Sequence, residues 1–202
     1  MGANYLQLIP IQEIAAGQVG AIRNQVERAL VAKASAELKM SPDLLVVRDI
    51  RPYDDLKWAT DNNATDGLAG TALAVNRWDF TTDASVVTWA SCIVSASRVM
   101  GDQRFVAIYG LRDSRMSEPT PPLMQCTLWK IVVGNSDKVI WDMSKCYAYK
   151  THAVGICPSA VIIPQNTQFD IYGYLPTSAG AAVSFVSLEG LLVEPRGKVI
   201  SP

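Results

Sequence analysis

The stretch TQFDIYGYL, at residues 167–175, alternates between two kinds of side chain along its length. One set is Phe169, Ile171, Gly173 and Leu175, and the set between them is Asp170, Tyr172 and Tyr174. Because successive side chains of a β-strand point to opposite faces of the sheet, this alternation predicts a strand with one buried face. Turn-forming residues lie on both sides of it, PQN at residues 164–166 and TSAG at residues 177–180.

Segments of the same kind fill most of the chain after residue 42. The predicted strands cover residues 44–50, 71–80, 85–99, 104–112, 123–133, 138–143, 146–156, 160–163, 167–175, 181–188 and 191–194. Many short strands separated by turns are typical of a sandwich or a barrel. We therefore expect a mainly β fold, an antiparallel β-sandwich of jelly-roll type, with no internal repeat and no linker.

The first 42 residues have a different pattern. Residues 4–14 are short, apolar and interrupted by Pro10, which indicates an extended arm or an edge strand. Apolar residues then recur every three or four positions from residue 19 to residue 38, the period of an amphipathic helix, before Ser41-Pro42 ends it. We divide the chain into an arm and helix (1–42) and a β-sandwich (43–202), and expect the two ends, 1–14 and 195–202, to order against a neighbouring subunit. The residues expected at that interface are Tyr5, Leu8, Ile11, Val26 and Leu30.

Composition excludes several classes of protein. The chain has 202 residues, of which 49% are hydrophobic and 18% charged, and its formal net charge is −1. A charged fraction below the roughly 25% of an average soluble domain favours a protein that buries surface against its own copies. The first forty residues hold four basic and three acidic side chains, so we expect no direct binding of nucleic acid. We also expect no membrane span and no secretory leader.

The sequence offers little that could carry a reaction. Cys92, Cys126, Cys146 and Cys157 form no C-x-x-C pair, and His152 is the only histidine, without a nucleophile elbow near it. We expect reduced, buried thiols; a metal cluster of Cys146, His152 and Cys157 is the alternative, and it lacks a fourth ligand. The prediction is a protein that is not an enzyme, with no catalytic residues and no cofactor.

The polar loop at residues 61–70 carries side-chain oxygens that could bind a hard cation such as calcium. Their spacing is roughly that of a calcium-binding loop. The weak candidates are Asp61, Asn63 and Asp66. Compared with an EF-hand loop, the glycine comes one position late, and the acidic residue that would bind the cation through both oxygens is missing. A solvated turn is therefore the preferred interpretation, and no metal is predicted.

Aromatic residues leave a second function open. The tryptophans Trp58, Trp78, Trp89, Trp129 and Trp141 are spread over several segments, which favours roles in the core or at subunit contacts. The alternative is a carbohydrate- or ligand-binding β-sandwich module.

Residues 70–202 resemble the jelly-roll proteins of icosahedral viruses and phages, most visibly in the run 158–202. The resemblance lies in strand layout over residues 70–202: a strand ending in Ile162-Ile163-Pro164, the turn at Gln165-Asn166, the strand Phe169–Tyr172, a strand through Val183-Ser184-Phe185 and the closing Glu194-Pro195-Arg196-Gly197. It implies a structural virion protein, a capsid, vertex or decoration subunit, that assembles in the host cytoplasm as a homo-oligomer. Its partners would be copies of itself and other virion proteins.

Overall fold

The computed structural model describes residues 4–50, 78–81, 89–113, 126–149, 153–174 and 183–198, with only the backbone at 78–81, 90–98 and 183–186. Its helix is α1 (Gln18–Leu38), and its short 3-10 turns are η1 (Ile11–Glu13), η2 (Pro42–Leu44), η5 (Cys146–Ala148) and η6 (Arg196–Lys198). The strands are β1 (Asn4–Gln7), β2 (Ile9–Pro10), β3 (Leu45–Asp49), β4 (Trp78–Thr81), β5 (Trp89–Val99), β6 (Phe105–Asp113), β7 (Leu128–Val133), β8 (Ser136–Asp142), β9 (Ala153–Ile163), β10 (Gln168–Tyr174) and β11 (Val183–Pro195).

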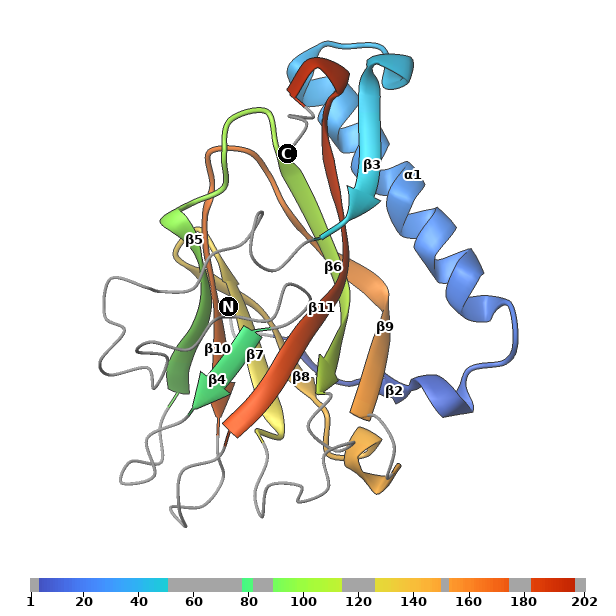
Figure 1. Cartoon of the computed structure of the whole chain (residues 1–202), viewed down its shortest axis with the longest axis vertical. Coiled ribbons are helices and arrows are strands. Elements are labelled where there is room, and N and C mark those ends of the chain that lie inside the picture. Colours follow the sequence, from blue (N-terminus) through green and yellow to red (C-terminus); the bar gives the residue numbers. More distant parts are fainter. Residues whose placement is uncertain are drawn as a thin grey trace.

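The strands form two sheets, shown in Figure 1 with α1 along one side. Sheet A has the order β1-β8-β7-β10-β5 and sheet B the order β2-β9-β6-β11-β3, with β4 also paired to β11. Neighbouring strands are antiparallel except for β1, which runs parallel to β8. The predicted mainly β fold with two sheets and one N-terminal helix is therefore confirmed.

The strand pairs are nested along the chain. β7 pairs with β8, β6 with β9, β5 with β10 and β3 with β11, each pair antiparallel. Successive pairs alternate between sheet A and sheet B. Among the described residues from β3 onward, the innermost of these nested pairs is therefore β7 with β8 and the outermost is β3 with β11.

The main core lies between the sheets. Sheet A contributes Trp129, Ile131 and Phe169, and sheet B contributes Val106 and Leu192, all at most 1% exposed. In β10 the residues predicted to share one face, Phe169, Ile171 and Gly173, are the buried ones, which confirms the alternation over the described residues; Leu175 lies outside them. Each fully buried side chain of this size contributes about 1.5–3 kcal/mol through removal from water.

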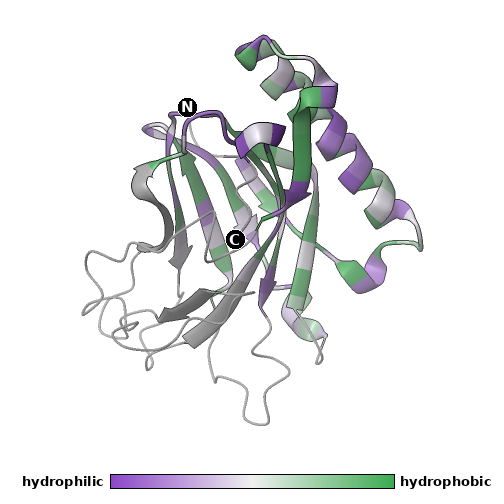
Figure 2. Ribbon diagram, turned by 45° about the horizontal axis from the view of Figure 1, so that its top comes forward, coloured by the Kyte–Doolittle hydropathy of each residue, from purple (hydrophilic) through white to green (hydrophobic). Residues whose placement is uncertain are grey.

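A second core lies between α1 and the outer face of sheet B. Val26, Leu30 and Ala34 are spaced four apart and form one buried stripe along α1. Beneath them lie Phe105 and Leu191, so β6 is buried on both faces. Figure 2 shows hydrophilic residues along much of α1 and mostly hydrophobic ones on β3 beside it.

The structure corrects three details of the predicted elements. Cys146–Ala148 is a 3-10 turn, and β9 begins only at Ala153. The predicted strands 146–156 and 160–163 merge into β9, because a bulge absorbs Pro158: Tyr109 alone lies opposite residues 157–160. Likewise the predicted strands 181–188 and 191–194 are one strand, β11.

Residues 4–14 contain edge strands, one of the two forms that the sequence predicts, because β1 and β2 each lie at the end of a sheet. The predicted contact was a neighbouring subunit, whereas β1 and β2 pair with this chain's own β8 and β9. The C-terminal end remains on its own chain as far as Lys198, whose Nζ donates to the carbonyl of Asp102 at 2.8 Å. Contacts between α1 and strands β3, β6, β9 and β11 cross the division drawn at residue 42.

Candidate functional site: the N-terminal edge and the outer face of sheet A

The N-terminal segment, residues 4–14, connects the two sheets at their edges. β1 adds to sheet A beside β8, and two residues later β2 adds to sheet B beside β9. Leu8 lies between them and is 1% exposed. A Cβ at Gly155 would stand 2.7 Å from the Cβ of Leu8 and 2.9 Å from the Sγ of Cys146. Only glycine at 155 therefore leaves room for Leu8 to enter the core.

Two carboxylates fasten this segment at its ends. The Tyr5 hydroxyl donates to Asp142 Oδ2, while Lys145 Nζ and the Tyr149 hydroxyl donate to Glu13, the latter at 2.9 Å. Hydrogen bonds from Lys145 and Tyr149 lower the pKa of Glu13. Burial opposes ionisation of Asp142, but hydrogen bonds from Tyr5 and Ser144 outweigh it and lower the pKa of Asp142.

The outer edge of β1 has no partner strand among the described residues. All four of its residues, NYLQ, are exposed and uncharged, with Tyr5 at 59% and Leu6 at 39%. Ile9 in β2 is a further exposed apolar side chain, at 38%. Edge strands are commonly protected by charges, proline or a covering element, and β1 contains neither a charge nor a proline.

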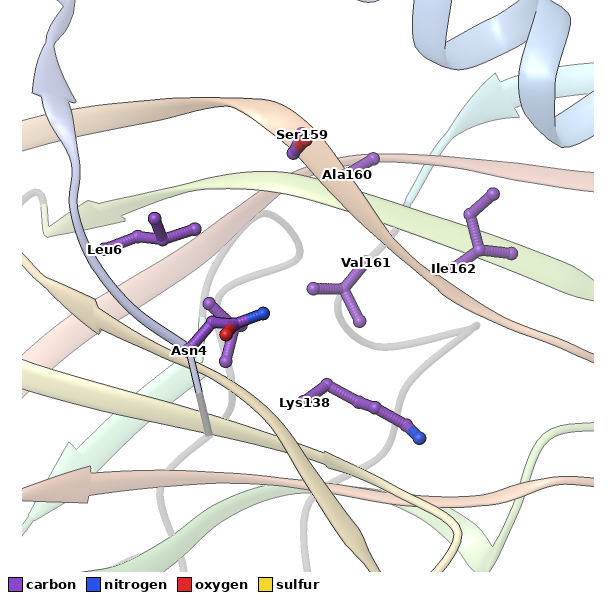
Figure 3. Close-up of a pocket in the computed structure, with 8 residues that line it drawn as sticks. Asn4, Leu6, Lys138, Ser159, Ala160, Val161 and Ile162 are labelled. Carbon is purple, nitrogen blue, oxygen red and sulfur yellow. The ribbon is translucent and has the colours of Figure 1, made fainter. Parts of the chain in front are cut away.

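A hollow of about 300 Å³, which we call the edge groove, lies beside β1. It is lined by Asn4, Leu6, Lys138, Val139 and residues 159–162. Leu6 and Val161 point toward one another across it (Figure 3). Its β9 wall includes the end of the bulge opposite Tyr109, which displaces Ser159 and Ala160 from regular pairing. The groove therefore offers apolar side chains next to an open strand edge, an arrangement suited to an added strand.

A second candidate surface is the outer face of sheet A. Tyr172 lies directly opposite Lys130 in the strand register, and Tyr174 lies directly opposite Trp89. Residues opposite one another share a face of the sheet, so these four side chains gather on one side. We call this set, Trp89, Lys130, Tyr172 and Tyr174, the aromatic face.

The members of the aromatic face contact one another. The rings of Trp89 and Tyr174 are 5.1 Å apart between centroids and tilted by 42°. Lys130 Nζ lies 5.0 Å from the ring centroid of Trp89 and 5.0 Å from that of Tyr172. The same ammonium is 3.5 Å from Asp137 Oδ2. Cation–π attraction and this ion pair hold the lysine between the two rings.

Beside the aromatic face is a second hollow of about 300 Å³. Its walls carry Asn135, Asp137, Gln168 and Asp170 around Lys130 and the Tyr172 ring. Carboxylates accept hydrogen bonds and amides both donate and accept, so the hollow presents a mixed hydrogen-bonding wall next to aromatic surface. Such a combination binds small polar molecules that have an apolar side.

The five residues predicted at the subunit interface have different positions. Leu8, Val26 and Leu30 are at most 4% exposed inside this chain, and Ile11 is partly buried against the core under α1. Tyr5 is the one of the five with a largely exposed side chain. A neighbouring molecule would therefore meet Tyr5 at the β1 edge, whereas Leu8, Val26 and Leu30 serve the chain's own cores.

Several other candidates lie outside the described residues. These are the cation-loop residues Asp61, Asn63 and Asp66, the lone histidine His152, and Trp58. Trp129 and Trp141 are fully buried between the sheets, in the core role that the sequence favoured.

In the part of the chain that is described, no three side chains of His, Cys, Asp or Glu lie close enough together to hold a metal ion. Of the described helices, none has both the length and the apolar character that crossing a bilayer requires.

Two of the described thiols, Cys146 and Cys157, are poor nucleophiles. Both are buried, as is the thiol of Cys126. Burial raises the pKa of Cys146 to about 11 and also raises the pKa of Cys157. Since the thiolate is the reactive form, both thiols are unreactive near neutral pH.

Sequence reasoning found only part of the aromatic face. The alternation in residues 167–175 placed Tyr172 and Tyr174 on one side of their strand, but Trp89 and Lys130 come from strands far away in sequence. Only the pairing of β10 with both β5 and β7 brings them together.

Comparisons of this chain with protein-family models, with curated proteins and with solved structures found no match.

Proposed function

We propose that this chain is a structural subunit of a virus or phage particle that acts by self-association, and that its sandwich is a jelly roll. The strand order carries the proposal. Taking β3 and β5 to β11 in chain order as strands one to eight, the sheets read 1-8-3-6 and 2-7-4-5. That arrangement fits a jelly roll, an eight-stranded double sheet used by capsid proteins and by some binding domains.

The elements outside these eight strands suit a subunit that contacts neighbours. β1 and β2 extend the two sheets at one edge, and α1 covers the outer face of sheet B. The outer face of sheet A has no covering element among the described residues. A subunit of a closed shell needs distinct patches that repeat by symmetry.

The β1 edge is the patch that we assign to self-association. A strand of a second copy would pair with the open hydrogen-bonding groups of β1 and place apolar side chains over Leu6 and the edge groove. This mode of recognition draws its affinity from main-chain hydrogen bonds and its specificity from pockets for alternate side chains. The uncharged sequence NYLQ presents no repulsion to such a partner.

Light scattering and electron microscopy of the concentrated full-length chain test the proposal. We expect the wild type to form defined oligomers, with Leu6→Lys reducing them because a charge on the edge opposes strand pairing. Leu44→Lys is the matched control, since Leu44 is 50% exposed on η2, away from β1, and should assemble as the wild type does. A wild-type chain that stays monomeric at about 1 mM would contradict the proposal.

A further inference from the structure

We propose that the aromatic face and its adjoining hollow bind a neutral saccharide. This binding function is separate from self-association at β1, because no residue lines both the edge groove and the hollow beside the aromatic face. The stacking surface would be Trp89, Tyr172 and Tyr174, and the hollow beside Lys130 would receive the hydroxyl groups.

The rings are held in place before any ligand arrives. Trp89 contacts Tyr174 at 5.1 Å, and the Lys130 ammonium lies 5.0 Å from both Trp89 and Tyr172. Side chains fixed by such contacts lose little conformational entropy on binding. All three rings remain partly exposed. One face of a sugar ring consists of C–H groups, and aromatic surface of this kind is its natural apolar partner.

The hollow supplies the complementary polar groups. Asn135 and Gln168 offer amide donors and acceptors, and Asp137 and Asp170 offer carboxylate acceptors. A saccharide hydroxyl both donates and accepts, so it matches this mixed wall better than a ligand that only accepts or only donates. A volume of about 300 Å³ is at the lower end for small-molecule sites, which suits one or two sugar units of a chain.

The charges decide between classes of saccharide. Lys130 is the cation among the residues that line the hollow, and it is already paired with Asp137 at 3.5 Å, while Asp170 accepts a hydrogen bond from the Ile171 amide at 2.8 Å. A carboxylated or sulfated sugar would therefore find no uncommitted cation in this wall and would be repelled by the Asp137 carboxylate. A cationic ligand would meet the Lys130 ammonium at the position between the rings that it would need to occupy. A neutral saccharide avoids both repulsions.

Isothermal titration of the full-length chain against defined oligosaccharides tests the inference. The neutral probes are hexasaccharides of cellulose, xylan, starch, chitin and β-galactan, and the acidic probes are oligomers of galacturonate and hyaluronan. We expect at least one neutral probe to bind with a Kd of about 1 mM or lower. Tyr172→Ala should weaken that binding about tenfold or more, because it removes a stacking ring.

Two further variants separate stacking from a general loss of structure. Tyr172→Phe keeps the ring and should retain most of the binding, whereas Tyr149→Ala removes an aromatic residue just after η5 and should leave binding unchanged. Thermal melting of each variant verifies that the fold is intact. Binding of no neutral probe, a preference for the acidic probes, or equal binding by the Tyr172→Ala variant would each overturn the inference; none of these outcomes depends on whether the chain self-associates.

Discussion

Leu8 is the residue on which attachment of the N-terminal segment most depends. It is 1% exposed, and its side chain occupies the space that a side chain at position 155 would fill if that residue were not glycine. Leu8→Ala should leave a cavity and lower the free energy of unfolding by about 2–4 kcal/mol. Urea denaturation measures the change. The nearby Leu6→Ala, at a side chain 39% exposed, should change stability by about 0.5 kcal/mol or less.

An equal effect of these two substitutions would show that Leu8 does not anchor the segment. Gly155→Ala gives a second measurement of the same contact from the opposite side. Its new methyl group would overlap Leu8 at 2.7 Å, so it should also destabilise the chain, by about 1–3 kcal/mol.

Glu194 is a buried acid held by two arginines from different strands. It is 1% exposed, and its two carboxylate oxygens accept from Arg48 Nε at 3.1 Å and Arg104 Nε at 2.9 Å. Glu194→Gln should lower the free energy of unfolding by about 3 kcal/mol, because two guanidinium groups lose their shared counter-charge. Arg48→Met should cost less, since Arg104 still neutralises the acid. Chemical denaturation that ranks the two variants the other way would contradict this account.

At the scale of elements, acid should release the N-terminal segment before it unfolds the sandwich. The folded pKa values of Glu13 and Asp142 are lowered, so their contribution is present above the unfolded values of about 4 and is lost as pH falls through the folded values. The protection of residues 4–14 against hydrogen exchange, taken relative to the intrinsic exchange rate at each pH, should therefore fall below about pH 4 more than the protection of β6.

The paired variant Glu13→Gln with Asp142→Asn removes both charges without acid. At neutral pH it should show the loss of protection of residues 4–14 against hydrogen exchange that the wild type shows only at low pH. Slow exchange in this variant would mean that the strand pairing and Leu8 hold the segment without help from the carboxylates.

The helix gives a separate test at this scale. Val26 is 4% exposed in the core under α1, so Val26→Asp buries an unpaired charge and should cost several kcal/mol. Gln25→Asp, one position away on the exposed side, is the matched control and should change the melting temperature little. Melting followed by circular dichroism compares them, and similar melting temperatures would show that α1 contributes little to the fold.

Local periodicity predicted the elements whose two faces differ in environment. β10 has one face in the core and one outward, so its alternation could be read directly, and the helix showed its buried stripe at spacings of four. β6 is buried on both faces, so its apolar run marks a strand without indicating which side chains face α1. The bulge at residues 157–160 depends on pairing with β6, and no local pattern contains that information.

The candidate sites were harder to predict because they arise from pairing between distant segments. The apolar residues 4–14 indicated an arm that needs a partner, and the partner is this chain's own β8 and β9. Trp89 and Tyr172 are 83 positions apart (172 − 89) and meet through Lys130 on a third strand. Composition suggested an aromatic site, but only the strand order of sheet A says which aromatics form it.

For the whole molecule, the two proposed surfaces should be separable by mutation. The β1 edge and the aromatic face are on the same sheet, but no residue lines both hollows. Leu6→Lys should therefore reduce assembly and leave saccharide binding at the wild-type value, whereas Tyr172→Ala should do the reverse. Because mutations without shared partners act additively, the double variant should lose both properties by the same factors as the single variants. Scattering and calorimetry on the four chains measure this; loss of both properties from either single change would indicate one shared interface, with the aromatic face buried between subunits rather than open to a sugar.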